Sequence, residues 1–355
     1  MILDITGYNT SGSGALHDLF HEFDNTIYPR DTDWEFELLW MVDGIYDLES
    51  KLYEKNILGF DSDIAIQRFE KLVYALNNKP VLNYGKVFKD DFFLECSKNY
   101  IKKIIGIEYM ARDFSDLVYQ TKNDEYKQQI NKYIRIFLGN RIARKIWGRG
   151  LSYRLQIEDR HKAKLSSHPN NFLQITQDYM QELFDYCKKG TNKILITDHL
   201  FPASNQDFYY KYIKEDFKSI IVKRDPRDCY LIAKVRYGSR DVPLPVGSVQ
   251  DFIWFYKHFI EDVALPDTDD RITINFEDII YKYDETLSKL CSFVDLGKHA
   301  FPKTMLNPEV SINNTQLFKL YKGFEEDIKK IENALPNSLY NFGDYTFNRT
   351  VESVF

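Results

Sequence analysis

What the sequence lacks excludes several classes of protein. It has no uninterrupted apolar run long enough to span a bilayer. Its first residues include Asp4 and carry no basic flank, so we expect no signal peptide. The four cysteines are scattered, without the spacing of metal ligands and without a paired pattern. We therefore expect reduced thiols in the core of a cytoplasmic protein.

Charge and composition further limit the classes of protein to which the chain can belong. Acidic residues exceed basic ones and give a net charge of -6, which argues against a general nucleic-acid binder. The chain has no linker rich in proline, glycine or serine, no repeat and no low-complexity tract. Hydrophobic residues make up 44% of the chain, which is enough for a substantial core, so we expect a globular protein.

The start of the chain has the pattern of a strand, a glycine-rich turn and a helix. An apolar run at 2–5 is followed by a turn of glycines and hydroxyl residues at 7–14, and then by apolar residues at helical spacing over 15–23. Glycines let the backbone approach an anion closely, and the free N–H groups of a helix start point toward it. This pattern predicts a phosphate site, and the alternative is a glycine turn without a ligand.

The turn differs from the loop of an ordinary ATPase. Gly7 and Gly12 have the spacing of a Walker A motif, but Ser13 stands where that motif has its lysine. A P-loop kinase also needs that lysine and magnesium ligands. The kinase class therefore becomes an alternative rather than the main prediction.

Further strands and helices alternate along the chain. Apolar runs near 193–197, 219–223 and 271–275, together with 2–6, are separated by segments with helical periodicity. This alternation is typical of an α/β protein with a parallel sheet, flanked by helices that form the crossovers. We interpret residues 1–355 as a single α/β domain with a large, mostly helical insertion at 61–189.

Charged residues follow two of the predicted strands. Asp198 and His199 come directly after one strand, and Arg224 and Arg227 follow the next. Ligands of open α/β sheets bind at the carboxyl ends of the strands, and arginine binds phosphate oxygens in pairs. We expect a turn at 25–30, and 35–40 could be a short second strand. Glu37, with Glu35, follows the glycine turn in sequence and could face its ligand, although solvated acids on a strand edge are the alternative.

A basic stretch with aromatic residues lies at 140–164, in contrast to the acidity of the whole chain. Such a stretch suits an anionic or sugar-like partner, or contact with a membrane surface. The alternative is a solvated helix face with salt bridges.

Four segments together resemble the sulfotransferases that use 3′-phosphoadenosine 5′-phosphosulfate (PAPS). The glycine turn looks like the family's 5′-phosphosulfate loop, and 194–202 looks like the strand that presents a catalytic histidine. The segment 222–228 looks like the 3′-phosphate motif, and 275–296 looks like a later conserved segment of the family. The match covers about half of the chain. Within the family, the sequence most resembles the bacterial enzymes that modify surface polysaccharides.

The resemblance implies a fold of the P-loop type and a sulfuryl transfer from PAPS to a hydroxyl of a carbohydrate or related acceptor, without a metal. It implies that His199 is the catalytic base, with Asp198 or Glu37 as the fallback. Residues 309–314 resemble a late segment that closes over the nucleotide in some members of the family. The implied nucleotide-binding residues are Asn9, Thr10, Ser11, Gly12, Ser13, Gly14, Ala15, Arg224, Arg227, Ser311 and Asn314.

Two departures from the family's pattern matter for the reaction. Thr10 stands where family loops carry a lysine or arginine, and Ile232 lies near the place of a serine in the 3′-phosphate motif. Lys223, Arg30 or a residue of the basic stretch could supply the missing charge. A protein that kept the fold, lost the loop cation and only binds a nucleotide is therefore a further alternative.

Overall fold

The computed structural model describes residues 1–29, 34–54, 59–79, 82, 84–112, 160–238 and 244–345, with isolated positions between 126 and 137. The chain divides into two compact units. The first unit contains Met1–Met41, Leu76–Cys96 and Thr176–Phe355, and the second contains Val42–Ala75 and Ser97–Ile175. Helices α3 (Phe60–Asn78), α5 (Phe92–Ile104) and α8 (Phe172–Lys188) each contain a point where the chain passes from one unit to the other.

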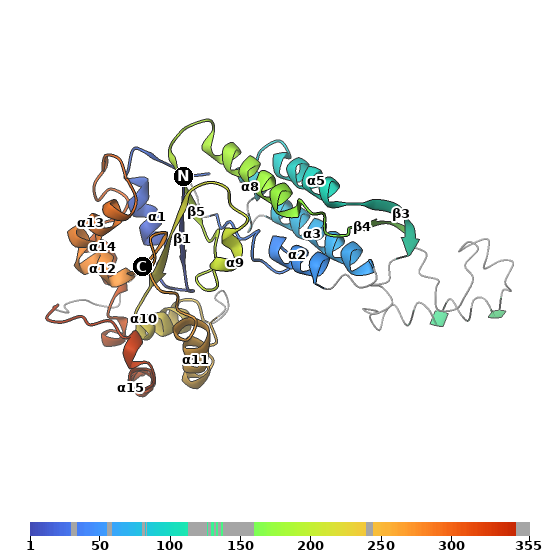
Figure 1. Cartoon of the computed structure of the whole chain (residues 1–355). Helices are drawn as coiled ribbons and strands as arrows, with labels where there is room; N and C mark the ends of the chain where they lie inside the picture. Colours follow the sequence, from blue (N-terminus) through green and yellow to red (C-terminus); the bar gives the residue numbers. More distant parts are fainter. Residues whose placement is uncertain are drawn as a thin grey trace. The chain divides into compact units, whose positions relative to one another are not determined.

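A five-stranded sheet forms the centre of the first unit, with strand order β2-β5-β1-β6-β7 (Figure 1). Every neighbouring pair is parallel, which confirms the predicted fold class. The strands read as nearly continuous apolar runs because helices cover a parallel sheet on both faces. Their bounds are β1 (Ile2–Gly7), β2 (Thr26–Ile27), β5 (Ile194–Asp198), β6 (Phe217–Lys223) and β7 (Arg271–Asn275).

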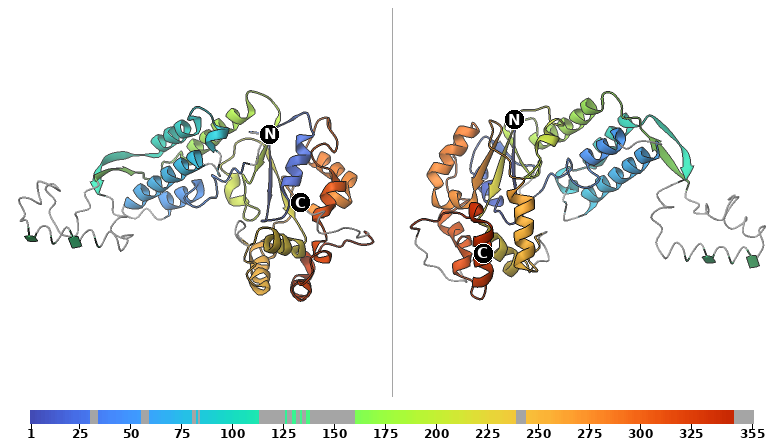
Figure 2. Two further views of the ribbon diagram at one scale, coloured as in Figure 1. Left: turned by 180° about the vertical axis from the view of Figure 1, so that it is seen from behind. Right: turned by 60° about the horizontal axis from the view of Figure 1, so that its bottom comes forward.

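One face of this sheet packs against helices from both ends of the sequence. Side chains alternate along a strand, so Leu3 and Ile5 share a face, where they join Leu16 of α1 (Gly14–His21) in the core. Helices α12 (Phe276–Tyr281) and α13 (Tyr283–Phe293) add to the same cluster. Figures 1 and 2 show α1, α12 and α13 on the same side of β1.

A second hydrophobic cluster lies beyond the carboxyl ends of the strands (Figure 1). It joins α10 (Pro226–Leu231), α11 (Val249–Tyr256) and α15 (Glu325–Ala334), with Tyr230, Phe252 and Ile331 fully buried among them. Two π-helical turns, 232–236 and 257–261, continue α10 and α11. This cluster positions the segments that follow β6 and those near the end of the chain at one edge of the sheet.

Shorter elements complete the first unit. Trp34 and Phe36 pack against Tyr84 and against Phe88 or Phe184 in an aromatic cluster. The remaining elements are α4 (Tyr84–Val87), α9 (Asp207–Tyr210), α14 (Pro308–Ser311) and the short 3₁₀ turns Ile312–Asn314, Leu317–Lys319 and Pro336–Ser338.

The second unit contains α2 (Ile45–Tyr53), parts of α3, α5 and α8, and an antiparallel pair of strands, β3 (Ile107–Arg112) and β4 (Arg160–Leu165). Asp63 of α3 accepts a hydrogen bond from the Lys164 backbone N–H, at 2.9 Å. The two strands lie within 61–189, which was expected to be mostly helical, and neither strand was predicted. Their pairing joins segments 48 or more residues apart, beyond the reach of a local pattern. The interpretation of 61–189 as an insertion in one domain stays a prediction.

Two smaller expectations about the sheet were wrong. The segment 35–40 was read as a strand, but it makes only an isolated bridge between Glu35 and Asp198. The edge strand β2 lies instead at Thr26–Ile27, inside a segment read as a turn. Thr26 is held there because its hydroxyl donates to the carbonyls of Phe20 and Phe23.

Several other expectations fall on residues that are not described. Arg30 and most of the basic stretch 140–164 lie outside the described residues; within that stretch the description begins at β4. Among the described helices, none is long and apolar enough to cross a membrane.

Candidate active site

The loop after β1 has a conformation that requires glycine. Gly12 has a φ of +85°, and a Cβ atom there would lie 2.6 Å from the ring of Phe276. Thr10 also has a positive φ of 65°, and the Ser11 N–H donates to the Tyr8 carbonyl at 2.8 Å. The loop is therefore tight, and it delivers the first N–H groups of α1 to the carboxyl edge of the sheet.

Polar atoms around this loop retain hydrogen-bonding capacity. In the described part of the chain, Ser11 Oγ, Arg224 Nε and Asn314 Oδ1 are buried without a hydrogen-bond partner. Buried polar atoms normally have partners, so each such atom needs an explanation. A phosphorylated nucleotide, which has many acceptor oxygens and several donors, fits this set of atoms.

Arg224 connects the loop with the late segment of the chain. Its guanidinium donates to the carbonyl of Thr10 at 3.2 Å and to the carbonyl of Asn314, and it lies over the Phe276 ring at 4.6 Å from the centroid. Only 7% of Arg224 is exposed. The structure thus brings Arg224, Asn314 and the loop together, and their binding to a nucleotide stays a prediction. Ser311 lies three residues before Asn314, at the end of α14.

Arg227 is engaged inside the protein. Its Nε and one terminal nitrogen donate to both oxygens of Asp225, at 2.9 and 2.7 Å, and its other terminal nitrogen donates to Glu332 at 2.8 Å. The guanidinium also lies 3.8 Å from the centroid of the Phe318 ring. The geometry gives Arg227 a structural role, and its binding to a nucleotide stays a prediction.

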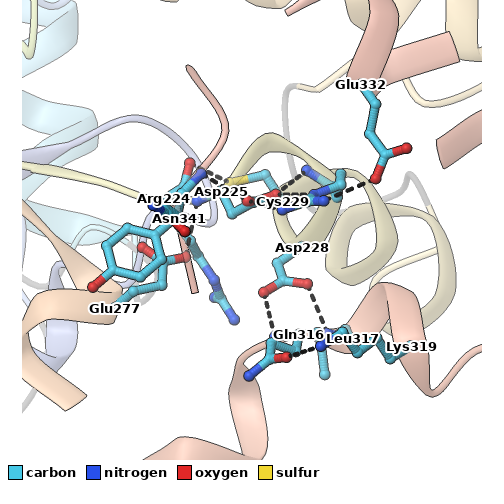
Figure 3. Close-up of polar contacts among 12 residues, drawn as sticks. Arg224, Asp225, Asp228, Cys229, Glu277, Gln316, Leu317, Lys319, Glu332 and Asn341 are labelled. Atoms are coloured by element: carbon cyan, nitrogen blue, oxygen red, sulfur yellow. Dashed lines mark hydrogen bonds and ion pairs between the residues drawn. The ribbon is translucent and has the colours of Figure 1, made fainter. Parts of the chain in front are cut away.

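Buried carboxyl groups hold the late segment against α10, as Figure 3 shows. Asp228 accepts from the backbone N–H groups of Gln316 and Leu317, both at 2.7 Å, and Glu277 accepts from the Asp225 N–H at 2.9 Å. Burial raises the pKa of Asp228 to about 7 and that of Glu277 to about 8. These bonds stabilise the position of the segment that carries Asn314.

His199 follows β5 in a left-handed conformation, with a φ of 56°. Its Nδ1 lies 2.6 Å from Asp198 Oδ1, and its Nε2 lies 3.3 Å from the Gly7 carbonyl oxygen. The backbone is held as well, because the His199 N–H donates to the Ile5 carbonyl and its carbonyl accepts from Trp40 Nε1. The side chain is therefore fixed at the start of the glycine loop.

Two residues that the sequence reading missed support this pair. His17 of α1 places Nε2 3.2 Å from Asp198 Oδ1, and Asp4 accepts from the N–H groups of Leu200 and Phe201 at 2.8 and 3.0 Å. A charged residue inside an apolar strand was the available signal for Asp4. Burial raises the pKa of Asp4 to about 7. Burial alone would raise the pKa of Asp198, but hydrogen bonds from His17 and His199 hold it well below its usual range.

A cavity of about 390 Å³ opens beside His199. Glu35 and Glu37 both line it; Glu37 is half-buried and Glu35 is exposed. Burial and the nearby Glu35 raise the pKa of Glu37 to about 7. The other lining residues are Gly7, Tyr8, Asn9, Trp40, Pro202, Ala203, Ser204, Leu244, Phe255, Phe259 and Ile260.

The acidic and imidazole groups near the cavity were also considered as metal ligands. Glu35, Asp198 and His199 each place a potential ligand atom within 4.8 Å of the others. The 2.6 Å hydrogen bond between Asp198 and His199 already uses two of these atoms. This is the arrangement of an ion pair, so we assign no metal ligands here.

Comparisons with known proteins add little to this picture. No family model matches the sequence, and no curated protein matches it. Among solved structures, the chain resembles the "Sulfotransferase Domain from the Curacin Biosynthetic Pathway", with a TM-score of 0.37 and 12% identity over 96% of this chain and 98% of that chain. A likeness of this size carries no argument, and the fold class rests on the observed parallel sheet.

Proposed function

We propose that the protein is a sulfotransferase that moves a sulfuryl group from PAPS to a hydroxyl of a carbohydrate or related acceptor. One observation carries the proposal. The glycine loop after β1, Arg224 after β6 and His199 after β5 follow three neighbouring strands at the same edge of the sheet. The start of the loop and His199 also border one cavity. An anion site next to a cavity with titratable groups is what group transfer from a nucleotide requires.

The donor nucleotide would bind on the loop side. The N–H groups of residues 12–14 would hold the 5′-phosphosulfate at the start of α1, where the helix dipole also favours an anion. Arg224 would face the 3′-phosphate, and Asn314 would contact the nucleotide from the late segment. The unpartnered Ser11 Oγ and Arg224 Nε support this assignment because they would gain acceptors from the phosphates.

The acceptor would bind in the cavity. Its wall combines aromatic side chains such as Trp40 and Phe255 with the acids Glu35 and Glu37, a mixture that suits a neutral, hydroxylated molecule. In the reaction, a base takes the proton of the acceptor hydroxyl while the hydroxyl oxygen forms a bond to sulfur. The bond between sulfur and the bridging oxygen breaks, and adenosine 3′,5′-bisphosphate leaves with the electron pair.

Two alternatives remain from other classes. A P-loop kinase would need a loop lysine and magnesium ligands, but Thr10, Ser11 and Ser13 provide only hydroxyls. A non-catalytic protein with the same fold would bind the nucleotide without turnover.

Thermal-shift measurements and a turnover assay separate these classes. We expect adenosine 3′,5′-bisphosphate to raise the melting temperature and ATP with magnesium to have little effect, and we expect PAPS turnover with a panel of neutral saccharides. A shift with ATP alone would support the kinase, and a bisphosphate shift without turnover on any acceptor would support the binding protein.

A matched pair of glycine variants makes the binding test specific for the loop. Gly12→Ala places a Cβ atom against Phe276, whereas Gly190→Ala has a similar backbone requirement (φ +71°) with nothing within 4 Å. Both variants carry the backbone strain of a left-handed alanine. We expect only Gly12→Ala to lose the shift with the bisphosphate, and equal behaviour of the two would argue against the loop as the binding site.

A further inference from the structure

Both ring nitrogens of His199 face oxygen atoms that can only accept hydrogen bonds. Nδ1 is 2.6 Å from the Asp198 carboxylate, and Nε2 is 3.3 Å from the Gly7 carbonyl oxygen. A neutral imidazole carries one N–H and can donate to only one of them. Only the imidazolium satisfies both partners, so the surroundings of His199 select its charged form.

The charged groups near His199 favour a cation. Asp198, Glu35 and Asp4 all exert attractive interactions on it, and Glu37 lies close enough to interact with it as well. His17 contacts the same Asp198 oxygen from α1, at 3.2 Å. The groups around His199 are therefore mostly carboxylates. Trp40 Nε1 donates to the His199 carbonyl and holds this residue in place.

His199 lies at the start of the glycine loop, and this loop has no lysine or arginine of its own. Gly7, the acceptor of the Nε2 contact, is the last residue of β1 and the first of the glycine turn. Thr10 occupies the place where a lysine or arginine was expected. Arg224 contacts the loop from the other side but stacks on Phe276 and donates to two carbonyls.

Glu37 is placed to act on an acceptor in the cavity. It lines the same cavity as His199, and Glu35 lines that cavity beside it. Burial and the negative charge of Glu35 favour the protonated form of Glu37 and raise its pKa. The Glu37 carboxylate can therefore accept a proton near neutral pH.

We propose that His199 is an imidazolium at neutral pH and supplies the positive charge missing from the loop, and that Glu37 is the base that takes the proton from the acceptor hydroxyl. This inference rests on the proposed sulfotransferase function. In the transfer step, the hydroxyl proton moves to the Glu37 carboxylate and the new oxygen–sulfur bond forms. The sulfur–oxygen bond to the bisphosphate breaks, and His199 keeps its proton and stabilises the charge that develops on the leaving oxygen.

The titration of the two groups gives the reaction a pH window. Burial by itself lowers the pKa of His199, but the hydrogen bond and charge of Asp198 raise it to about 9. The pKa of Glu37 is about 7 because of burial and Glu35. The rate should therefore rise as Glu37 loses its proton near pH 7 and fall as His199 loses its proton near pH 9. A histidine base would instead give a rate that rises toward pH 9 and does not fall there.

The charge of His199 can be tested without any assumption about the reaction. Nitrogen-15 NMR of the imidazoles, with the His199 signals assigned from their loss in His199→Gln, reports how many ring nitrogens carry a proton. We expect both nitrogens of His199 to be protonated at pH 7.5 and to titrate near pH 9. A neutral ring at pH 7.5 would overturn the proposal.

Turnover of PAPS by three variants tests the roles. Glu37→Gln should slow turnover by about 10²–10⁴-fold, the range for loss of a general base, and leave affinity for adenosine 3′,5′-bisphosphate unchanged. His199→Lys keeps a positive charge and should retain more turnover than His199→Gln. If both His199 variants are equally inactive while Glu37→Gln is active, His199 is the base and the proposal is wrong.

Glu285→Gln, at an exposed position of α13 outside the cavity, is the control for Glu37→Gln and should keep wild-type turnover. Glu35→Gln tests the neighbouring carboxyl, and we expect it to move the acid limb of the pH profile to lower pH. Wild-type protein that binds the bisphosphate but transfers no sulfuryl group would overturn the proposed function and Glu37 as its base. The NMR result would still decide the charge of His199.

Discussion

The ends of β5 and β6 both carry charged residues but have different surroundings. The two strands lie on either side of β1, and each ends in a run of charged residues. After β6, Arg227 is closed in by Asp225 and Glu332, and Asp228 is closed in by backbone N–H groups. After β5, His199 and Glu37 border a cavity of about 390 Å³. Charged residues therefore stabilise the structure at the end of β6, whereas at the end of β5 they border the cavity proposed for the acceptor.

The difference comes from which segments cover each strand end. The end of β6 is covered by α10, α15 and the segment 312–319, which bring carboxylates and N–H groups to the charges. The end of β5 is covered by the residues around Glu35 and Trp40, and these leave space beside His199. Substitutions after β6 should thus act mainly on stability, and those after β5 mainly on turnover.

The largest effect is expected for Arg227→Met. It removes the partner of Asp225, a fully buried carboxylate, and the cost of leaving such a charge without its partner is about 3–5 kcal/mol of unfolding free energy. Urea denaturation of the variant and the wild type measures this difference. As a control, Lys329→Met removes an exposed cation on α15 and should change the unfolding free energy by less than about 0.5 kcal/mol. A similar small loss for Arg227→Met would remove the contrast between the two strand ends.

An intermediate effect is expected for Arg224→Ala, because Arg224 follows β6 but is proposed to bind the nucleotide. Loss of a charged hydrogen bond is worth about 1.5–3 kcal/mol, so affinity for adenosine 3′,5′-bisphosphate should fall by roughly ten- to hundredfold. Affinity for adenosine 5′-phosphosulfate, which has no 3′-phosphate, should change little. Calorimetry with both nucleotides measures this, and equal losses for the two would show that Arg224 does not contact the 3′-phosphate.

The smallest effect is expected for Glu277→Gln, and it depends on pH. The pKa of Glu277 is raised by burial to about 8, so its protonated form is favoured in the folded protein and wild-type stability is lost as pH rises from about 4 through 8. Glutamine keeps the acceptor for the Asp225 N–H without a charge. The variant should be more stable than the wild type by about 1–3 kcal/mol above pH 8, the cost of a buried group without its partner.

Denaturation at pH 5 and pH 8.5 measures this change. Asp225, Asp228 and Arg224 are present in both proteins and interact with Glu277, so the difference reports the charge of Glu277 together with its effect on these neighbours. Glu285→Gln, at an exposed position of α13, serves as the control and should show no such pH dependence. A variant that is less stable than the wild type at pH 8.5 would contradict the prediction.

Much of the fold was predictable from local patterns. The strands β1, β5, β6 and β7 were expected at nearly the observed positions, because continuous apolar runs bounded by polar residues mark buried parallel strands. The antiparallel strands β3 and β4 were not expected, because their pairing joins residues 48 or more positions apart and no local pattern reports it. The two-residue strand β2 has no periodicity to recognise.

The sequence by itself determined the class of fold, the glycine loop, and the charged residues that follow β5 and β6. These depend on residue type and local spacing, which act over a few positions. Only the tertiary structure decided what each charged group does, because that depends on partners far away in the chain. Arg227 is paired by Glu332, 105 residues later, and Asp228 by the N–H of Gln316, 88 residues later. His199 meets the Gly7 carbonyl across 192 residues, and this contact, together with Asp198, favours its charged form.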